Sequence, residues 1–563
     1  MIYIGEDFVS LREHTKKKKM LKKGIDRNQL QMLSLESLVA QDSVVRVIDA
    51  FVDALPLEQL GFIIKGKIKN GAPAYPAKDL LKLYYYGYLN KVRSSRKLER
   101  EAITNLEAMW LIKGLRPGYK TIADFRKDNK KGLKNVFRSF NQFLLQNDLF
   151  DTELIAVDGS KFRAQNSKKN NYNEKKVEQH LEYIEKQTSQ YLDQMDELDK
   201  IEEESESQLE QRIDIAQKLD HLNTRQQKYE DLQQQVKDAR LNGQTQISTV
   251  DPDARALPKK MNIVEVGYNL VTATEANNKF ITNFKVFNQN DAYTLSEISK
   301  DAKAVLNTNS QEDNSITVLA DKGFDTGHEL KICAEHNIQT IVAPKKRQTR
   351  KKNPKFAKDA FEYDVQQNIY ICPQGEHLTT NGNDYQKKAY NQHRASYKFK
   401  RYNASYKICK QCPFKDDCVG KPKLKQRRGR VIERSEYETY IQENIERYKV
   451  NKELYRQRQA IVEHPFGTIK RQWGYDHTLL KTIEKVSAEF SIILTCYNLR
   501  RAISILGVNA LVEQIITYIL FVITLLQRIL SRFKLSLKIV TFRKLIFLQQ
   551  YLSVNQFYRI PAD

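Results

Sequence analysis

The sequence predicts an α/β protein with a mixed sheet flanked by helices, preceded by a helical domain and interrupted by a long helical hairpin. Three observations support this fold class. Apolar runs of strand length alternate with helical patterns in residues 151–172 and 244–344. Residues 28–150 follow helical spacing, and residues 173–240 lack glycine and proline and repeat apolar residues every seven positions. At 563 residues the chain exceeds one core, so roughly three or four domains are expected.

The composition indicates a polyanionic partner. The chain has 93 Lys and Arg against 69 Asp and Glu, a formal charge of +24 and a pI near 9.4. Nucleic acid is the simplest such partner, although composition alone fits a ribosome-associated protein nearly as well. Six cysteines without a paired framework suggest a reducing compartment. The charged first residues and an apolar stretch at 515–526, shorter than a membrane span of roughly 20 residues, predict a cytoplasmic, nucleoid-associated protein without a membrane partner.

Residues 1–27 are a basic arm, and residues 28–150 are predicted to be a helical DNA-binding domain. Lysines 16–19 in the arm are open to two interpretations, a solvated tail or a phosphate contact. Pro76 is expected to open one helix and Thr121 to cap another. Arg93 and Arg96 flank two serines, and small hydroxyls beside arginines are good phosphate contacts. The alternative is an ordinary helical bundle with a basic surface.

Residues 173–243 are predicted to be a coiled-coil hairpin of two antiparallel helices inserted into the sheet domain. We expect it to space or dimerise the protein and to carry no chemistry. The seven-residue repeats on which this rests are Ile184, Tyr191 and Leu198, then Ile215, Leu222, Tyr229 and Val236.

The sheet domain is expected to consist of residues 151–172 and 244–344. Its elements follow in the order strand, hairpin, helix, strand, helix, strand, which favours a mixed sheet with helices on its faces. The predicted ranges are 154–157 for the first strand, 266–271 and 280–286 for the hairpin, 295–306 and 328–336 for the helices, and 316–320 and 338–342 for the last strands.

Three acidic residues are candidate metal ligands. Asp158 and Asp321 each follow an apolar run, so both are expected at carboxyl ends of strands, where open α/β sheets place their sites. Glu463 lies in a helical segment, residues 461–470. Taken alone, each aspartate is better explained structurally, Asp158 as a turn residue before Gly159 and Asp321 as a partner of Lys322. Together, three such carboxylates can hold a pair of Mg²⁺ ions around a phosphodiester.

The blocks around these residues resemble DDE transposases of bacterial insertion sequences, in the group whose catalytic glutamate lies in a Tyr-Arg-Glu-Lys signature. Arg458 is one residue farther from the glutamate than is usual in that group, so Arg456 is an alternative. The signature residues here are Tyr455, Arg458, Glu463 and Lys470. Other blocks that resemble the family are residues 157–162, 320–324, 38–49 and 93–96, whereas residues 117–119 depart from it.

The resemblance implies an RNase H-like catalytic domain and two Mg²⁺ or Mn²⁺ ions held by Asp158, Asp321 and Glu463. It implies cleavage of double-stranded DNA at transposon ends and transfer to target DNA, by a homodimer or a higher assembly. A nuclease without strand transfer would use the same carboxylates. A domesticated DNA-binding protein would be expected to have lost one of them. A structural RNA-binding protein would explain the charge but not the three acidic contexts.

The segment around Glu463, residues 431–505, is expected to contribute catalytic-domain helices. Arg456, Glu463 and Lys470 are seven residues apart, so a continuous helix would place them on one face, with the cations holding phosphates. Pro465 either kinks this helix or begins it. Trp473 is either a base-stacking residue or part of the core.

Residues 345–430 form a basic insertion, and residues 506–563 a helical tail. Four cysteines of the insertion can close a structural Zn²⁺ site, although only one Cys-x-x-Cys pair is present and free thiols are about as well supported. The candidate zinc ligands are Cys372, Cys409, Cys412 and Cys418.

Overall fold

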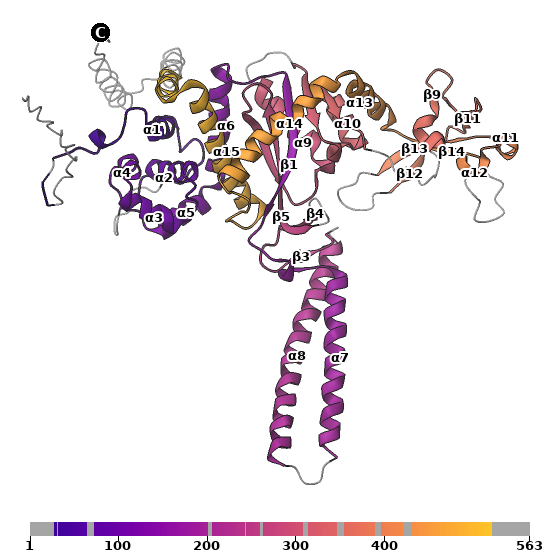
Figure 1. The fold of residues 1–563 in the computed structure, drawn as a ribbon, viewed down its shortest axis with the longest axis horizontal. Coiled ribbons are helices and arrows are strands. Elements are labelled where there is room, and N and C mark those ends of the chain that lie inside the picture. Colours follow the sequence, from indigo (N-terminus) through magenta and orange to yellow (C-terminus); the bar gives the residue numbers. More distant parts are fainter. Residues whose placement is uncertain are drawn as a thin grey trace, which may run out of the picture.

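The computed structural model describes residues 28–30, 32–64, 73–200, 205–241, 244–258, 263–307, 313–345, 354–388, 396–419, 429–518 and 520. In Figure 1 an N-terminal helical domain lies beside a central sheet, a second small sheet lies on its other side, and two long helices project from the base. The N-terminal arm and residues 521–563 fall outside the described residues. Among the residues described, no helix is both long and apolar enough to cross a membrane.

The N-terminal domain packs around α2 (Ala77–Leu89), which is buried along nearly its whole length. This helix begins directly after Pro76, as predicted. The predicted cap at Thr121 is wrong, because the helix begins two residues earlier, at Tyr119, after the extended Gly118. The other elements of this domain are the 3₁₀ turn Glu36–Leu38, α1 (Val44–Ala54), α3 (Ser95–Thr104), α4 (Leu106–Leu111), α5 (Tyr119–Asp128) and α6 (Lys130–Gln146).

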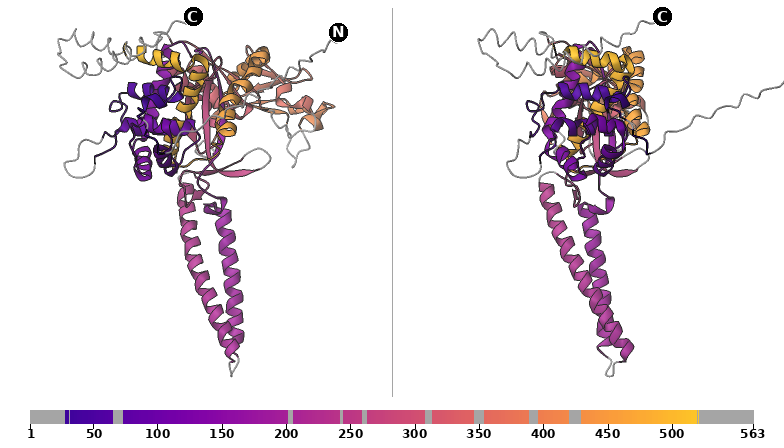
Figure 2. Two further views of the ribbon diagram at one scale, coloured as in Figure 1. Left: turned by 60° about the vertical axis from the view of Figure 1, so that its left-hand side comes forward. Right: turned by 90° about the vertical axis from the view of Figure 1, so that its left-hand side faces the viewer.

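The insertion folds as two long helices, α7 (Glu174–Leu198) and α8 (Glu206–Leu241). They lie side by side in both views of Figure 2 and project away from the rest of the chain. Their base is closed by the short antiparallel pair β2 (Asn171–Tyr172) and β3 (Ile247–Ser248). Apolar residues of the seven-residue repeats meet between the helices. Coiled-coil packing and dimerisation stay predictions. The repeat residues buried there are Ile184, Leu222, Tyr229 and Val236.

The central sheet has the strand order β4-β5-β1-β7-β8, with β6 also paired to β5. Strand β1 runs antiparallel to β5 and parallel to β7, and β7 runs parallel to β8. The predicted order of strand, hairpin, helix, strand, helix, strand is confirmed. The bounds are β1 (Leu154–Arg163), β4 (Arg255–Pro258), β5 (Val264–Glu275), β6 (Ile281–Phe287), α9 (Leu295–Leu306), β7 (Ile316–Ala320), α10 (Gly327–Glu335) and β8 (Ile338–Val342).

Strand β1 is longer than the sequence predicted. The apolar run ends at Val157, but β1 continues to Arg163 because its second half pairs with β5. Asp158 therefore lies inside a strand rather than at its end. The parallel pairing with β7 does stop at Val157, so beyond it β1 pairs with a strand on the β5 side only, and on the other side Arg163 alone forms an isolated bridge, with His477.

Helices cover both faces of the sheet. Helix α14 (Lys452–Phe466) packs Ile461 and Val462 against Ala156 and Leu319. Val157 points to the opposite face and belongs to the main core together with residues of α9. Helix α10 packs against α9, α13 (Glu438–Val450) contacts both α10 and α14, and α15 (Ile483–Leu506) packs against α6, α2 and β6. Residues 508–518 are also helical.

A second sheet lies between β8 and α13 and was not predicted. It is built from short strands in the order β12-β13-β11-β10-β9, with β14 paired to β13. Its strands have few apolar residues each, so period-two alternation is hard to recognise in the sequence. The elements are β9 (Glu362–Asp364), β10 (Ile369–Ile371), β11 (His377–Thr380), β12 (Tyr385–Lys387), β13 (Tyr397–Asn403), α11 (Tyr406–Gln411), α12 (Lys415–Cys418) and β14 (Val431–Ser435).

Candidate active site

Asp158 and Asp321 are brought together by the register of β1 and β7. Val157 lies opposite Ala320 as the last pair of this parallel ladder, and each aspartate is the next residue along its chain. Neighbouring strands lie about 4.8 Å apart. Side chains two residues apart along extended backbone share a face, so Asp158 points the same way as Ala156, and Asp321 the same way as Leu319. Both aspartates therefore point to the face that α14 covers.

The Asp158 carboxyl lies in a partly buried, acidic environment. Its pKa is raised from the ordinary value of 3.8 to about 6, chiefly by burial and to a smaller extent by the nearby carboxylates of Asp291 and Asp321. The Arg458 guanidinium and the Gly159 N–H, which donates to Asp158 Oδ1 at 2.9 Å, oppose this rise in pKa. Burial of the carboxyl therefore outweighs the stabilisation of its charged form by these two donors.

Helix α14 directs two residues of the predicted signature at this pair. The Arg458 side chain is 16% exposed, and its Nη1 lies 3.9 Å from Asp158 Oδ2. Tyr455 lies near Asp321, whose charge acts with burial to raise the pKa of the phenol. These residues are three apart on the helix and so share a face. The structure thus supports Arg458, rather than Arg456, as the signature arginine.

Glu463 lies on another side of α14. It follows Arg458 by five residues, which turns its direction by about 140° on a regular helix. The Glu463 side chain is exposed, and its Oε1 accepts a hydrogen bond from Gln459 Nε2 at 2.8 Å. The described contacts therefore gather Asp158 and Asp321 but do not connect Glu463 with them, and its place in the site stays a prediction.

Within the described ranges, no three His, Cys, Asp or Glu side chains are arranged so that they could hold a metal ion. The chemistry of the donor set nevertheless fits a hard divalent cation. Asp158 and Asp321 offer carboxylate oxygens, the ligands that Mg²⁺ and Mn²⁺ prefer. The pKa of Asp158 is raised mainly by burial, and a bound cation would favour the charged form of this carboxyl.

Asp291 is an acidic neighbour that the sequence analysis missed. It begins the 3₁₀ turn Asp291–Tyr293 that precedes α9, and it raises the pKa of Asp158 more than Asp321 does. No apolar run precedes Asp291, so the signal that singled out the other two aspartates is missing here.

Two parts of the chain match known protein families. Residues 245–499 match the family described as Transposase DDE domain, which includes Asp321 and Glu463. Residues 33–128 match the family described as Transposase domain (DUF772). The chain belongs to the DDE transposases of insertion sequences. Asp158 lies outside both matched ranges, as does the α7–α8 hairpin.

No curated protein sequence matches this transposase. Among solved structures it is similar to the cryo-EM structure of a piggyBac transposase synaptic complex with hairpin DNA. That alignment covers 93% of this chain and 86% of the other at 8% sequence identity, with a TM-score of 0.28. A likeness this distant supports no conclusion about the fold or site of this transposase.

The other two basic residues predicted around Glu463 occupy different environments. Arg456 is 73% exposed and pairs with Glu453 at 2.5 Å, pointing away from the aspartates. Lys470 Nζ donates to the Lys161 carbonyl at 2.6 Å and lies 4.2 Å from the Phe162 ring centroid. Arg456 and Glu463 share a face, because both lie in α14 and are seven residues apart. The prediction is wrong for Lys470, because the helix widens to a π-helical turn at residues 467–472.

Pro465 neither begins α14 nor ends it, since it lies inside the helix one residue before the last. A proline has no N–H to donate to the preceding turn, and the π-helical turn follows directly. Trp473 is 4% exposed, and its ring packs edge-on against Tyr475. Its core position favours the packing interpretation over base stacking.

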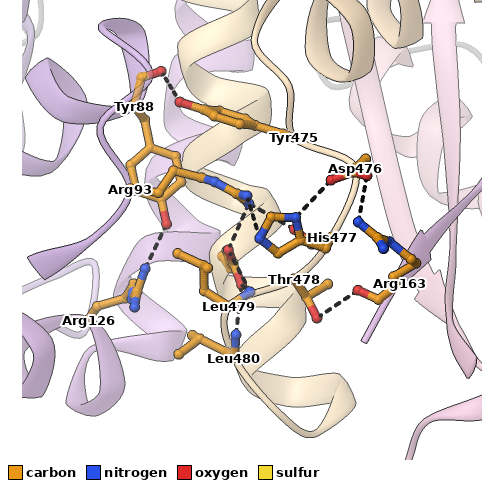
Figure 3. Close-up of polar contacts among 11 residues, drawn as sticks. Tyr88, Arg93, Arg126, Arg163, Tyr475, Asp476, His477, Thr478, Leu479 and Leu480 are labelled. Carbon is orange, nitrogen blue, oxygen red and sulfur yellow. Dashed lines mark hydrogen bonds and ion pairs between the residues drawn. The ribbon is translucent and has the colours of Figure 1, made fainter. Parts of the chain in front are cut away.

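Arg93 joins the N-terminal domain to the C-terminal helices of the transposase and is buried (Figure 3). Its Nη1 donates to the His477 carbonyl at 2.9 Å and contacts the buried Glu489 carboxylate at 3.4 Å. The guanidinium also stacks 4.3 Å from the Tyr475 ring centroid. These contacts assign Arg93 a structural role and correct its predicted contact with DNA. Arg96 is exposed over the Tyr119 ring and remains a candidate for DNA contact.

The loop that holds Arg93 also reaches β1. Asp476 Oδ2 accepts from Arg163 Nη2 at 2.9 Å, and the Thr478 N–H donates to the Arg163 carbonyl at 2.8 Å (Figure 3). Arg163 is the last residue of β1. The strand that carries Asp158 is therefore connected through one loop to the N-terminal domain of the transposase.

The four candidate zinc ligands lie in the small second sheet and its helices. Cys372, Cys409 and Cys418 pack against its apolar cluster, and Cys372 Sγ accepts the N–H groups of Gln374 and Glu376, each at 3.3 Å. All four are free thiols that are partly exposed. As stated above, no metal-binding group is formed among the described residues, so zinc binding stays a prediction.

Proposed function

We propose that this transposase cleaves DNA at the ends of an insertion sequence and joins the freed 3′-hydroxyl to target DNA, through Asp158, Asp321 and Glu463. The observation that carries the proposal is the adjacency of Asp158 and Asp321 beyond the last pair of the β1–β7 ladder. The mixed order β6-β5-β1-β7-β8, with helices on both faces, supports assigning an RNase H-like catalytic domain.

Asp158 and Asp321 would hold divalent cations, Mg²⁺ or Mn²⁺, with Glu463 as the third carboxylate. When bound, such ions lower the pKa of an attacking hydroxyl and neutralise charge on the leaving oxygen. Glu463 must then turn from Gln459 toward the aspartates, which a change of side-chain rotamer and helix position on DNA binding would permit.

Arg458 and Tyr455 are proposed to act on the substrate phosphate. Arg458 lies against Asp158 in the free chain, and its Nη1 has no hydrogen-bond partner among the described residues. A buried donor without a partner is costly. A phosphodiester oxygen beside Asp158 would satisfy it, and the planar guanidinium suits such an oxygen.

Double-stranded DNA is the proposed partner, at the insertion-sequence ends and at the target. The net charge of +24 supplies the electrostatic attraction for it. Arg96, Arg456 and Lys470 are proposed contacts, and a homodimer or higher assembly would hold two ends together. Action on DNA places the protein at the nucleoid. Strand transfer distinguishes this function from that of a nuclease, which would stop after cleavage.

The decisive experiment measures Mg²⁺-dependent cleavage and joining of a labelled insertion-sequence end. Asp158→Ala, Asp321→Ala and Glu463→Ala are each expected to abolish both products while DNA binding in gel shift is kept. Asp301→Ala, an exposed carboxylate on α9, is the matched control and should retain activity. Wild-type cleavage without joined product would support the nuclease instead. Full activity of Asp158→Ala or Asp321→Ala would overturn the proposal.

A further inference from the structure

The Asp291 carboxylate occupies the space that a side chain at position 159 would need. A Cβ built on Gly159 would lie 2.1 Å from Asp291 Oδ1. Such a distance is far inside van der Waals contact, so glycine directly after Asp158 is what lets this carboxylate approach β1. Asp291 also approaches the other aspartate segment, since its Oδ2 lies 3.5 Å from an ideal Cβ on Gly323. The Asp291 carboxylate thus lies between Gly159, which follows Asp158, and Gly323, which is two residues after Asp321.

Asn269 of β5 fixes this position. Its Nδ2 donates to Asp291 Oδ1 at 2.8 Å, and the Asn269 side chain is fully buried. The second carboxylate oxygen, Oδ2, is directed to the side of Gly323 and Asp321. A carboxylate held through one oxygen by a buried amide, with its charge acting on Asp158, resembles a ligand oriented by an outer partner.

Three buried polar atoms of β5, the neighbour of β1, have no hydrogen-bond partner among the described residues, namely Asn269 Oδ1, Thr272 Oγ1 and Thr274 Oγ1. Thr272 lies directly opposite Asp158 in the β1–β5 ladder, so their side chains share a face. Asn269 Oδ1 lies 3.0 Å from an ideal Cβ on Gly159, on the other face. Buried polar atoms are normally satisfied, and unpaired ones on both sides of Asp158 indicate that a ligand and its water shell belong here.

The open edge of the sheet lets Asp291 reach that ligand. Asp158 points to the α14 face, whereas Gly159, and hence Asp291, lies toward the α9 face. Strand β7 ends at Ala320, so beyond this level no strand of the sheet stands beside β1 to separate the two faces. Groups from both faces can therefore meet at this edge.

We propose that Asp291 is a further carboxylate of the catalytic centre, supplying an oxygen to the divalent cation held by Asp158 and Asp321 and oriented by Asn269. Because these three side chains do not form a metal-binding group among the described residues of the free chain, they would converge when the cation binds. The inference rests on the proposed function. It adds a ligand from the layer of α9 to those contributed by the sheet and by α14.

The test is Mn²⁺ binding to the full-length chain, with free Mn²⁺ followed by electron paramagnetic resonance, so that no catalysis is required. Asp291→Asn is expected to weaken the apparent affinity by about tenfold or more, and Asn269→Ala by about tenfold, since removing an orienting partner typically costs 10–100-fold. Asp158→Asn is the positive control, and Asp301→Asn on α9 should bind within twofold of wild type.

The two proposals fail in different ways. Loss of Mn²⁺ binding in Asp158→Asn with Asp291→Asn unchanged would overturn this inference and leave the proposed function intact. Unchanged binding in Asp158→Asn as well would remove the basis of both. Thermal unfolding of each variant shows that the fold is retained.

Gly159→Ala provides an independent variant, which carries the test if Asp291→Asn does not fold. The added methyl group would displace the Asp291 carboxylate and is expected to weaken Mn²⁺ binding. In an Asp291→Ala background the 2.1 Å contact is gone and only the 3.0 Å approach to Asn269 Oδ1 remains, so the second change should add less than it does in the wild type. If instead the losses in Mn²⁺ binding free energy of the two single variants add up in the double variant, Gly159 acts on Asp158 directly, and the inference would be wrong.

Discussion

Asp158 and Asp321 are the first residues beyond the parallel ladder of β1 and β7, one on each chain segment. They are 163 positions apart in the sequence, yet the pairing of Val157 with Ala320 leaves no freedom in their relative placement. Such positioning by rigid strands is what a catalytic centre requires, since small displacements cost large factors in rate.

Arg458 and Arg456 are two residues apart on α14 but should differ in their effect on cleavage. Arg458→Ala is expected to lower the cleavage rate at least tenfold, because it removes the guanidinium next to Asp158. Arg456→Ala should stay within about twofold, because its side chain points to solvent and an exposed pair such as Arg456–Glu453 contributes little. Single-turnover cleavage of end DNA measures both. The reverse ranking would identify Arg456 as the signature arginine.

Asp158→Asn should stabilise the metal-free protein at neutral pH. Folding raises the pKa of Asp158 from 3.8 to about 6, so between these values the folded chain binds more protons than the unfolded chain. The free energy of unfolding therefore falls as pH rises through this window and stays low above it. For a carboxyl that keeps 29% exposure, the gain at pH 7.5 is on the order of 1 kcal/mol.

Thermal unfolding of wild type and Asp158→Asn at pH 7.5 and pH 3.5 checks this sign. The variant should have the higher Tm at pH 7.5, and the difference should disappear at pH 3.5, where the wild-type carboxyl is protonated in both states. A lower Tm for the variant at pH 7.5 would mean that the Asp158 charge stabilises the fold.

Arg93→Ala should destabilise the protein, and Arg96→Ala should weaken DNA binding. Removing Arg93 leaves the buried Glu489 carboxylate without its ion pair, at a cost of about 3–5 kcal/mol in the free energy of unfolding. Removing the exposed Arg96 should leave stability unchanged and reduce the salt dependence of DNA binding by about one unit of slope. Urea unfolding and binding titrations at several salt concentrations separate the two effects.

Deletion of the α7–α8 hairpin should leave the central sheet folded. Strands β2 and β3 bring the two ends of the insertion together, so a short Gly-Ser linker can replace residues 174–243. Mn²⁺ binding should be retained. If the hairpin joins two copies, light scattering will show a loss of dimer in the deleted protein. An unchanged molar mass per chain would exclude this role for the hairpin.

The central domain could be predicted because its signals are local. Helix α9 has the predicted bounds, Leu295–Leu306, and β8 has the predicted Ile338–Val342. The continuation of β1 beyond Asp158 could not be predicted, because its second half, Asp158–Arg163, is polar and is held as strand by pairing with β5. Tertiary pairing overrides the propensity of such a segment.

The contributions of single side chains were harder to predict than the elements that carry them. Arg93 was expected at a DNA surface, but a buried glutamate nearly 400 positions away binds it. The common face of Arg456 and Lys470 assumed a regular helix, and the π-helical turn changes the angle. Asp291 carries no local pattern at all, and only the packing of its turn against Gly159 reveals it. Each case depends on contacts between distant segments.

The unequal lengths of two adjacent strands have a further consequence. Because β1 outlasts β7, the sheet has a notch at the level of Asp158, and its depth is set by the five residues that β1 has beyond Asp158. Between the end of β7 and the bridge of Arg163 with His477, no strand stands on that side of β1, and we expect this gap to be left for the phosphates of a duplex. Extending β7 by a few residues would close the notch, and we expect it to abolish DNA cleavage although every acidic side chain is unchanged.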